Sequence, residues 1–292
     1  MEIEVKSQKS QPEADQHWAE KVENTAWLNP DHPNFERWER ARELSIERGK
    51  YVKSIVEKYI ICENLNVLDL GSGEGGTSII FSERNKVISC DLNLIRLERQ
   101  RNNFGNYYRI NGDALKLPFK KNSFDLIIIQ DVIEHLTVTP DLISKIKTVL
   151  RNNGIVYIST PNKYSIFNVF ADPHWGLPLI SILTRKRIKK YFLKNFRKDE
   201  INRKDIPQLL SLNDISNNFG YYFEINLETK HSFEKLLKGD KGIIWSDFHI
   251  NLVKLIKKMR IGNMLLFLTN NKIGIINKYF NPTFYLVMKK IK

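Results

Sequence analysis

The chain has 292 residues, of which 42% are hydrophobic and 27% are charged, and its net charge is +13. This composition is typical of a globular protein and excludes collagen-like, low-complexity and wholly disordered chains. Its two cysteines do not form a CxxC pair, which excludes a disulfide framework and a cysteine-rich zinc site. The N-terminus lacks the apolar core of a secretory signal, and no run reaches the roughly 18 apolar residues of a membrane span. We therefore expect a cytoplasmic protein.

The charge is divided unevenly along the chain. Residues 1–160 hold 22 basic and 23 acidic residues, whereas residues 161–292 hold 24 basic and 10 acidic residues, a net charge of +14. A neutral half joined to a basic half favours an anionic partner for the second half. The alternative is a general bias toward lysine on solvated surfaces, and the sequence leaves both interpretations open.

Helical spacing is the first regular pattern in the chain. A polar start is followed over 17–38 by a segment with three tryptophans, which is too aromatic for a free tail and is expected to pack on the core. From about residue 35 to residue 62, apolar residues recur with the period of a helix. Gly49 is expected to interrupt or bend this helix.

Short apolar runs then alternate with helical segments. The run at 124–130, FDLIIIQ, is almost entirely apolar, as expected for a strand that is covered on both faces. The alternation predicts a doubly wound, mostly parallel, Rossmann-like α/β sheet of seven strands. Strands are predicted at residues 66–70, 86–91, 106–111, 124–130, 154–159, 222–228 and 283–289, and helices at 75–82, 92–101, 140–150 and 206–219.

Two segments in the second half, at about 163–207 and 231–281, are longer than ordinary loops and should carry structure of their own. We expect them to form a basic helical cap over the carboxyl edge of the sheet. The chain then divides into three parts. Residues 1–62 form a tail and a helical lid, residues 63–162 form a ligand-binding α/β core, and residues 163–292 hold the rest of the sheet together with the cap.

A glycine-rich loop follows the first predicted strand. Residues 69–76, DLGSGEGG, place glycines where the chain turns sharply and where a ligand can approach the backbone closely. The GxGxxG spacing alone is a weak indication of NAD. Asp69, however, would repel a pyrophosphate and attract an ammonium group, and Asp91 can accept hydrogen bonds from two ribose hydroxyls. S-adenosylmethionine carries an ammonium group and a ribose but no phosphate, so it suits both carboxylates.

With this loop, the sequence resembles the class I S-adenosylmethionine-dependent methyltransferases, and the resemblance extends through residues 60–162. Residues 111–119, NGDALKLPF, are similar to the family segment that binds adenine, and residues 123–136, SFDLIIIQDVIEHL, to the fourth strand and the loop beside the methionine moiety. The subgroup it is most similar to contains quinone-biosynthesis and small-molecule methyltransferases. The resemblance implies S-adenosylmethionine as the cofactor, bound by Asp69, Gly71, Ser72, Gly73, Gly75, Asp91, Leu92, Asp113, Ala114 and Asp131.

Several of these residues have structural alternatives. Asp69, Asp91 and Asp113 can each cap a helix or a turn without contacting a ligand. Asp125 opens a strand, and we expect it to be structural. Cys62 and Cys90 are expected to be buried residues without chemistry; they lie beside apolar runs.

The turn with Asp131, Glu134 and His135 resembles the Glu-x-x-Glu-His motif of metal-assisted methyltransferases. One turn supplies too few ligands for Mg²⁺ or a similar ion, so we expect no metal. The alternative to a metal site is that Glu134 caps or forms an ion pair and that His135 lies near the substrate entrance. His135 is therefore a candidate catalytic residue.

His174 lies in the segment ADPHWGLP after the fifth predicted strand, and this segment can form a wall of the acceptor pocket. His174 is the second candidate catalytic residue, as a general base on an acceptor hydroxyl. The alternative is that it only hydrogen-bonds the loop backbone. Methyl transfer needs little beyond alignment and desolvation, so the lack of a catalytic triad does not exclude activity.

The predicted function is methyl transfer to a small molecule, a glycan or a lipid-linked acceptor, with oxygen as the expected acceptor atom. The basic second half leaves RNA methylation as an alternative, but no signature of base methylation or RNA-binding module is present, so we do not expect a nucleic acid partner. A non-catalytic partner subunit is a further alternative, although the intact glycine loop argues against it. Apolar residues Phe248, Leu252, Leu255, Ile256 and Met259 share a helical face among lysines, which favours peripheral contact with an anionic membrane or simple packing on the sheet edge.

Overall fold

The computed structural model describes residues 30–31, 35–102, 105–202, 205–243 and 247–291. Its centre is a seven-stranded sheet with the order β3-β2-β1-β4-β5-β7-β6. Strands β1 to β5 pair in parallel, and β7 is antiparallel to β5 and β6. The predicted doubly wound, mostly parallel sheet is therefore confirmed. The strands are β1 (Asn66–Leu70), β2 (Lys86–Asp91), β3 (Tyr108–Asn111), β4 (Phe124–Gln130), β5 (Leu150–Pro161), β6 (Phe223–Leu227) and β7 (Thr283–Lys290).

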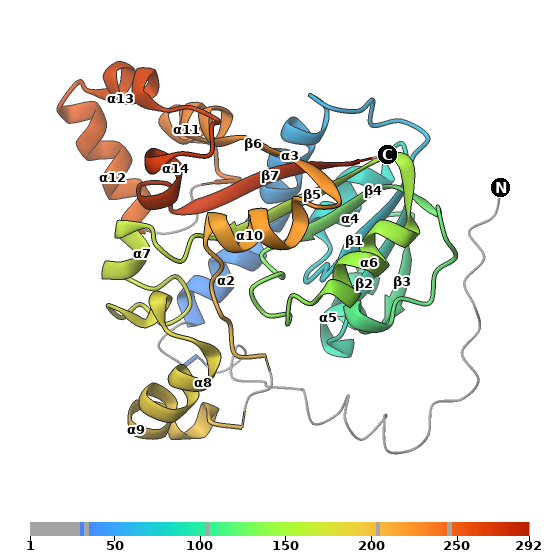
Figure 1. Ribbon diagram of the computed structural model, residues 1–292, viewed down its shortest axis with the longest axis horizontal. Coiled ribbons are helices and arrows are strands. Elements are labelled where there is room, and N and C mark those ends of the chain that lie inside the picture. The colour runs from blue at the N-terminus through green and yellow to red at the C-terminus, as the bar shows by residue number, and fades with distance from the viewer. Residues whose placement is uncertain (1–29, 32–34, 103–104, 203–204, 244–246, 292) are drawn as a thin grey trace.

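Helices cover both faces of this sheet (Figure 1). On one face, α6 (Pro140–Val149) and α10 (Leu212–Phe219) pack against the side chains of Leu68 and Leu70. On the other face, α3 (Ser45–Val56) and α4 (Gly76–Ser82) pack against Val67, which points the opposite way because side chains alternate along a strand. Each fully buried leucine or valine contributes about 1.5–3 kcal/mol, so these two layers stabilise the sheet that positions the site.

The N-terminal helical region differs from the prediction. It consists of α2 (Phe35–Glu43) and α3, which are separated at Leu44 rather than at Gly49, and helix α3 ends at Val56. Gly49 is buried inside α3, and a Cβ there would lie 2.8 Å from the carbonyl oxygen of Gly76. Glycine is therefore needed for close packing of α3 on α4, and the expectation that it interrupts the helix was wrong. The tryptophan segment at 17–29 lies outside the described residues, as does the side chain of Trp38.

The two long insertions both carry structure of their own, as their length predicts. Residues 163–207 contain the short helices α7 (Ile166–Phe170), α8 (Arg185–Arg187) and α9 (Lys194–Phe196), and a π-helical stretch at Ile188–Leu193 joins α8 to α9. A small core in this insertion consists of Trp175, Ile180, Ile188, Phe192, Leu193 and Ile206. Residues 231–281 hold most of α11 (Thr229–Lys238), followed by α12 (Asp247–Lys258), α13 (Gly262–Leu268) and α14 (Ile275–Tyr279). Both insertions gather at the left of Figure 1, at the end of the molecule where β5 finishes and β7 begins. Among the described residues, no helix is long and apolar enough to cross a bilayer.

Candidate active site

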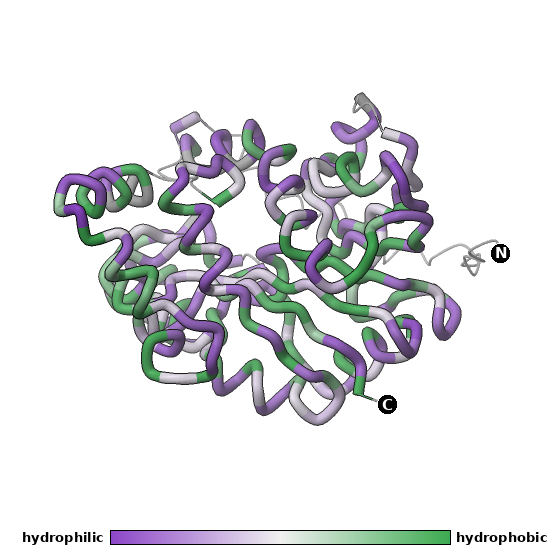
Figure 2. Tube along the Cα trace, turned by 90° about the horizontal axis from the view of Figure 1, so that it is seen from above, coloured by the Kyte–Doolittle hydropathy of each residue, from purple (hydrophilic) through white to green (hydrophobic). Residues whose placement is uncertain are grey.

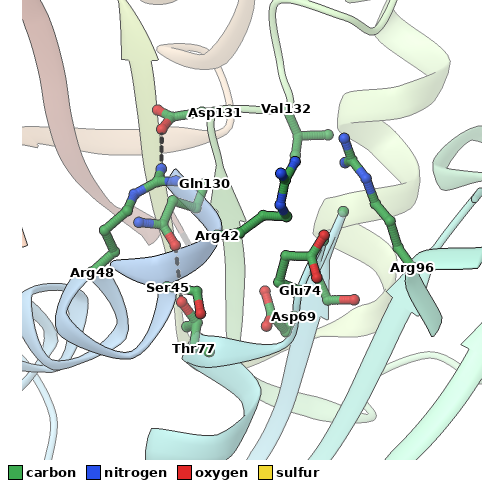
Figure 3. A pocket seen from close by; sticks show the side chains of 14 residues that line it. Arg42, Ser45, Arg48, Asp69, Glu74, Thr77, Arg96, Gln130, Asp131 and Val132 are labelled. Atoms are coloured by element: carbon green, nitrogen blue, oxygen red, sulfur yellow. Dashed lines mark hydrogen bonds and ion pairs between the residues drawn. The ribbon is translucent and has the colours of Figure 1, made fainter. Parts of the chain in front are cut away.

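A pocket opens where β1 and β4 lie side by side, at the carboxyl ends of both strands (Figure 3). This is the switch point of the sheet, because the chain order runs outward from β1 in one direction and from β4 in the other. The pocket has a volume of about 180 Å³. Its lining comes from α2, α3, the end of β1, the glycine loop, the start of α4, α5 (Leu94–Arg99), the end of β4 and the turn after it. The lining residues are Arg42, Ser45, Arg48, Asp69, Gly71, Ser72, Gly73, Glu74, Gly76, Thr77, Arg96, Gln130, Asp131 and Val132.

The glycine loop lines the pocket with its backbone. Gly71, Gly73 and Gly75 all have positive φ angles, of 75°, 54° and 77°. A Cβ on Gly71 would overlap the side chain of Val132 on the opposite wall. Glycine is therefore required at position 71 both for the turn and for the close packing of the loop against Val132, the second residue after β4.

Asp69 is the buried carboxylate of this pocket. Its side chain accepts a hydrogen bond of 2.6 Å from the Ser78 hydroxyl. Burial raises the pKa of Asp69 to about 7, and the negative charge of Asp91 contributes in the same direction. A cationic ligand group at this position would stabilise the ionised form. The geometry thus fits the predicted ammonium contact, although Asp69 also has the structural hydrogen bond that its alternative interpretation expects.

Asp91 lies at the end of β2, next to the glycine loop, but it does not line the 180 Å³ pocket. One carboxylate oxygen accepts from the amide of Gly73 at 2.8 Å, and the other accepts from the amide of Asn93 at 2.8 Å. Each carboxylate oxygen has a second lone pair, so the same group can still accept from ribose hydroxyls. Asp91 therefore fixes the loop and remains available for the predicted contact.

The predicted adenine-binding residues are close to Asp91 in the fold and likewise lie outside the pocket lining. Asp113 caps a short turn through a 2.8 Å hydrogen bond from the amide of Leu115, which is the structural role left open above. Asn111 donates from its side chain to the carbonyl oxygens of Asp91 and Leu92, which ties the ends of β2 and β3 together. Leu92, Asp113 and Ala114 therefore lie beside Asp91 and outside the pocket, and their contact with adenine stays a prediction.

Sequence reasoning missed the contribution of the N-terminal helices to the pocket. Arg42 at the end of α2 points between the glycine loop and Val132, and Arg96 approaches from α5 (Figure 3). Thr77 donates a 2.9 Å hydrogen bond to Gln130, which joins the start of α4 to the end of β4. The contribution of the N-terminal helices depends on tertiary packing. Helix α2 lies far from the motifs in sequence, and the spacing of its arginines predicts no site.

Asp131 is held at the far side of the pocket in a left-handed conformation, with φ of 53°. Arg48 of α3 forms an ion pair with one carboxylate oxygen, and the Ser159 hydroxyl donates to the other at 2.8 Å. A non-glycine residue in this conformation is uncommon and is frequently found at functional sites. Asp131 was predicted to lie beside the cofactor, and its place in the lining fits that prediction.

Glu134 follows in the same turn, with a fully buried carboxyl group. Thr160 donates to one oxygen at 3.0 Å, whereas the other accepts no hydrogen bond from the described residues and lies 3.7 Å from Nε2 of His174. Burial and, next to it, the negative charge of Asp131 raise the pKa of Glu134 to about 8. Only the ionised form of this carboxyl group can stabilise positive charge on the His174 imidazole, and a proton on His174 would in turn favour ionisation of Glu134.

The fold brings His135 and His174 together from segments 39 positions apart. Their rings meet edge to face, with centroids 5.2 Å apart. The Nδ1 atom of His135 lies 2.9 Å from the carbonyl oxygen of Asp205; donation to this oxygen leaves Nε2 as an acceptor. Asp172 accepts from the amide of His174 at 2.8 Å and lies 4.0 Å from its Nδ1, so the imidazole sits between two carboxyl groups. Neither histidine lines the 180 Å³ pocket.

The same side chains could in principle hold a metal ion. Glu134, His135 and His174 offer ligand atoms that all lie within 4.8 Å of one another. Ligands of a tetrahedral zinc ion lie about 3.3 Å apart, so the three side chains would have to close around it. His174 is a ligand from outside the turn that the sequence prediction did not count, and metal independence stays a prediction. Asp131 takes no part in this group, since it pairs with Arg48.

Other predicted structural roles are confirmed. Asp125 accepts from the amide of Asn66 at 2.8 Å and pairs with Arg151 at 2.6 Å, far from the pocket, so it joins strands β1, β4 and β5. Cys62 and Cys90 are both buried, and burial raises the pKa of their thiols to about 11 and about 12. Thiols of this kind stay protonated and unreactive.

Comparison with known proteins places the chain in a family. The family model described as "Methyltransferase domain" matches residues 61–291. An uncharacterised protein of Methanocaldococcus jannaschii is 29% identical over 52% of this chain and 68% of its own length. A probable S-adenosylmethionine-dependent methyltransferase of Mycolicibacterium smegmatis is 31% identical over 43% of this chain. The chain spans less than half (47%) of that mycobacterial relative.

A solved structure supports the fold. The S-adenosylmethionine-dependent methyltransferase of Mesorhizobium loti superimposes with a TM-score of 0.51 over 82% of this chain and 96% of the other, at 16% identity. The family match covers the sheet, the glycine loop and both insertions. Together with the buried carboxylate at the switch point, it confirms the resemblance found in the sequence: the chain belongs to the class I S-adenosylmethionine-dependent methyltransferase family.

Proposed function

We propose that the protein transfers the methyl group of S-adenosylmethionine to a hydroxyl group of a small-molecule, glycan or lipid-linked acceptor. The observation that carries this proposal is the buried Glu134 against His174, directly after the turn residue Asp131 that lines the pocket. Such a pair can accept the proton that a hydroxyl group loses when it becomes the nucleophile.

The pocket residues bind and orient the cofactor, whose sulfonium supplies an electrophilic methyl group. In the proposal, Asp69 receives the ammonium group and Asp91 accepts from the ribose hydroxyls. Asp113 and the amide of Ala114 bind adenine, while the loop from Gly71 to Gly75 packs against the cofactor through its backbone. These contacts hold the methyl group toward Asp131, at the edge of the histidine cluster.

His174 is the proposed general base, and Glu134 is its positioning residue. When His174 takes up a proton, the two flanking carboxyl groups of Glu134 and Asp172 stabilise the imidazolium ion. His135 packs its ring on His174 and is fixed by the Asp205 carbonyl, so it lines the acceptor side and keeps His174 in place.

The relatives differ in the atom that receives the methyl group. One is named malonyl-[acyl-carrier protein] O-methyltransferase, from Marinomonas, and is 25% identical over 62% of this chain. Another is named ubiquinone/menaquinone biosynthesis C-methyltransferase, from Wigglesworthia glossinidia brevipalpis, and is 24% identical over 54%. Because these names disagree, the proposal that oxygen receives the methyl group rests on the pair of His174 and Glu134. A hydroxyl acceptor needs such a general base more than an amine or sulfur nucleophile does.

RNA remains the alternative acceptor, and one observation favours it. The segment from Arg185 to Lys198 is strongly basic and exposes Tyr191 and Phe196, a combination that can stack bases and pair with phosphates. The apolar side chains Ile188, Phe192 and Leu193 of this segment, however, are buried with Trp175 in a small core, which suits a wall of a small pocket equally well.

The test is an unbiased transfer assay. The purified protein is incubated with S-adenosylmethionine labelled with ¹³C in its methyl group, in separate lipid, polar-metabolite and RNA fractions of a cell extract. The ¹³C chemical shift of the product distinguishes methyl on oxygen, nitrogen and carbon. We expect label on oxygen in the lipid or polar fraction, and label in RNA or on nitrogen or carbon would contradict the proposal.

The His174→Gln variant tests the base directly. Loss of a general base lowers the transfer rate by about 10²-fold or more at neutral pH. Binding of S-adenosylhomocysteine should stay unchanged, because the proposal places His174 on the acceptor side and assigns it no contact with the cofactor. Restoration of the variant's rate at high pH, where the acceptor hydroxyl ionises by itself, would support a proton-transfer role over a structural one. A variant as active as the wild type would contradict the assignment.

A further inference from the structure

The C-terminal insertion carries an apolar surface that the fold leaves uncovered. We use the name C-terminal surface for the exposed side chains of α12, α13 and α14 and the loops between them. Helix α13, with the sequence GNMLLFL, has no buried residue. Phe267 is 89% exposed and Ile275 is 72% exposed. Helices α13 and α14 together expose the large apolar or aromatic side chains of Met264, Phe267, Leu268, Ile275, Ile276 and Tyr279. Exposed apolar side chains that gather in this way often mark an interaction site.

After Asp247, the first residue of α12, the charge of this segment is entirely positive. From residue 248 to the C-terminus the chain has no aspartate or glutamate, whereas Lys254, Lys257, Lys258, Arg260, Lys272 and Lys278 lie between the apolar residues. All of these are exposed except Lys278, which is half-buried. Figure 2 shows hydrophobic and hydrophilic stretches interleaved along the helices at the left, the end that holds α12–α14 in Figure 1. Exposed apolar groups among lysines are complementary to an anionic lipid bilayer, whose acyl chains are apolar and whose headgroups are negative.

The surface is held in a fixed shape. Asn277 of α14 is fully buried; it accepts from the Thr229 hydroxyl at 2.7 Å and donates to the carbonyl oxygens of Asn270 and Lys272 at 2.8 Å. On α12, Val253 and Ile256 are both buried, and Val253 belongs to the core that packs against the sheet. The predicted apolar face of α12 is thus divided, because Ile256 faces inward while Leu255 and Met259 are exposed; the side chains of Phe248 and Leu252 lie outside the described residues.

The same surface is tied to the candidate active site. Asn162, directly after β5, donates to the carbonyl oxygens of Asn277, Lys278 and Asn281. The two residues before Pro161 on this strand, Ser159 and Thr160, are the hydrogen-bond donors of Asp131 and Glu134. One strand end therefore contacts the pocket on one side and anchors α14 on the other.

We propose that the C-terminal surface binds the headgroup region of an anionic phospholipid membrane. Phe267, Met264 and Ile275 enter the interface between headgroups and acyl chains, and the lysines of α12 contact the lipid phosphates. Because β5 connects this surface to the pocket, the bound protein presents its acceptor side toward the bilayer. The inference goes beyond the proposed function, since membrane binding needs neither the cofactor nor methyl transfer.

Vesicle co-sedimentation of the full chain tests this proposal. Wild-type protein is mixed with vesicles of phosphatidylcholine alone or with 30% phosphatidylglycerol, at low and at physiological salt. We expect binding to the anionic vesicles that weakens as salt rises, and at least tenfold weaker binding to neutral vesicles. The double variant Phe267→Ser/Ile275→Ser should lose at least tenfold in anionic-vesicle affinity, and Lys257→Glu/Lys258→Glu should lose the salt dependence.

Tyr221→Ser is the matched control, because Tyr221 is 81% exposed but lies just before β6, outside the C-terminal surface. It should bind vesicles as the wild type does. Thermal unfolding and S-adenosylhomocysteine titration of every variant confirm that the fold and the cofactor site are intact. Equal vesicle binding by all variants, or none by the wild type, would overturn the proposal. So would a dimer that the Phe267→Ser/Ile275→Ser variant loses, since it would assign the surface to a second copy of the chain. None of these results would affect the proposed methyl transfer.

Discussion

Replacing Asp69 with asparagine is expected to remove the pH dependence of cofactor binding. In the proposed binding mode the ammonium group of S-adenosylhomocysteine pairs with an ionised Asp69, but burial raises the pKa of this carboxyl to about 7. At acidic pH the free protein therefore holds a proton that the ligand must displace. The substitution keeps the size of the side chain and an oxygen that can accept from Ser78, so the packing around β1 is preserved.

The size of the effect follows from the ionised fraction of Asp69. With a pKa of about 7, this fraction is roughly 9% at pH 6 and roughly 76% at pH 7.5. Binding that requires the carboxylate thus becomes about eightfold tighter over this interval, or about 1.3 kcal/mol. The free energy of unfolding changes with pH in the opposite direction to the cofactor affinity. A folded-state pKa above the usual 3.8 means that the unfolded chain releases its proton first, so this residue lowers the free energy of unfolding as pH rises from about 4 through 7.

Isothermal titration with S-adenosylhomocysteine at pH 6.0, 6.5, 7.0 and 7.5 measures this directly. Titrations in buffers of different ionisation enthalpy give the number of protons released, which should be about one half at pH 7. The Asp69→Asn variant should bind about 1.5–3 kcal/mol more weakly at pH 7.5 and show no dependence on pH in this range. Asp141→Asn, at the exposed start of α6, is the matched control. Wild-type affinity that stays flat over the range, with Asp69→Asn equal to it, would refute the reasoning.

Three further predictions follow from the same structure. Asp91→Ala should weaken S-adenosylhomocysteine binding by about 1.5–3 kcal/mol in a titration, and unchanged affinity would exclude the ribose contact. Gly49→Ala should lower the free energy of unfolding in urea by about 1–3 kcal/mol, because the new Cβ would lie 2.8 Å from the Gly76 carbonyl oxygen. Gly274→Ala, whose nearest neighbour would lie 4.0 Å away, should change it by less than about 0.5 kcal/mol, and equal effects would contradict the packing argument. Finally, EDTA should leave the transfer rate unchanged once an acceptor is known, whereas a loss that Mg²⁺ or Zn²⁺ reverses would assign a metal to the histidine cluster.

The sheet could be predicted from the sequence because its strands are buried on both faces. Runs such as Phe124–Gln130 are too short and too uniformly apolar for exposed helices, and their order in the chain defines the parallel core. The ends of the elements were less certain. β5 extends from Leu150 to Pro161, because Leu150 pairs with Phe124 of β4 and residues 155–161 pair with the antiparallel β7. The local sequence pattern does not reveal these pairings.

The site could be predicted only where its residues lie next to a motif. Asp69 and the glycine loop follow a strand directly, so their position at the switch point was implied by the fold class. Arg42 and Arg48 reach the pocket from a pair of helices whose docking is decided by Gly49 and its contact with α4. Likewise, the contact of Glu134 with His174 depends on how the insertion after β5 folds back, and no local spacing encodes it.

The most direct test of the account is a crystal structure of the protein in complex with S-adenosylhomocysteine. The account predicts the ligand at the carboxyl ends of β1 and β2, with its ammonium group within hydrogen-bond distance of Asp69, its ribose hydroxyls on Asp91 and its sulfur facing Asp131. A ligand bound elsewhere, or a ligand in this crevice whose ammonium group avoids Asp69 and whose ribose avoids Asp91, would contradict it.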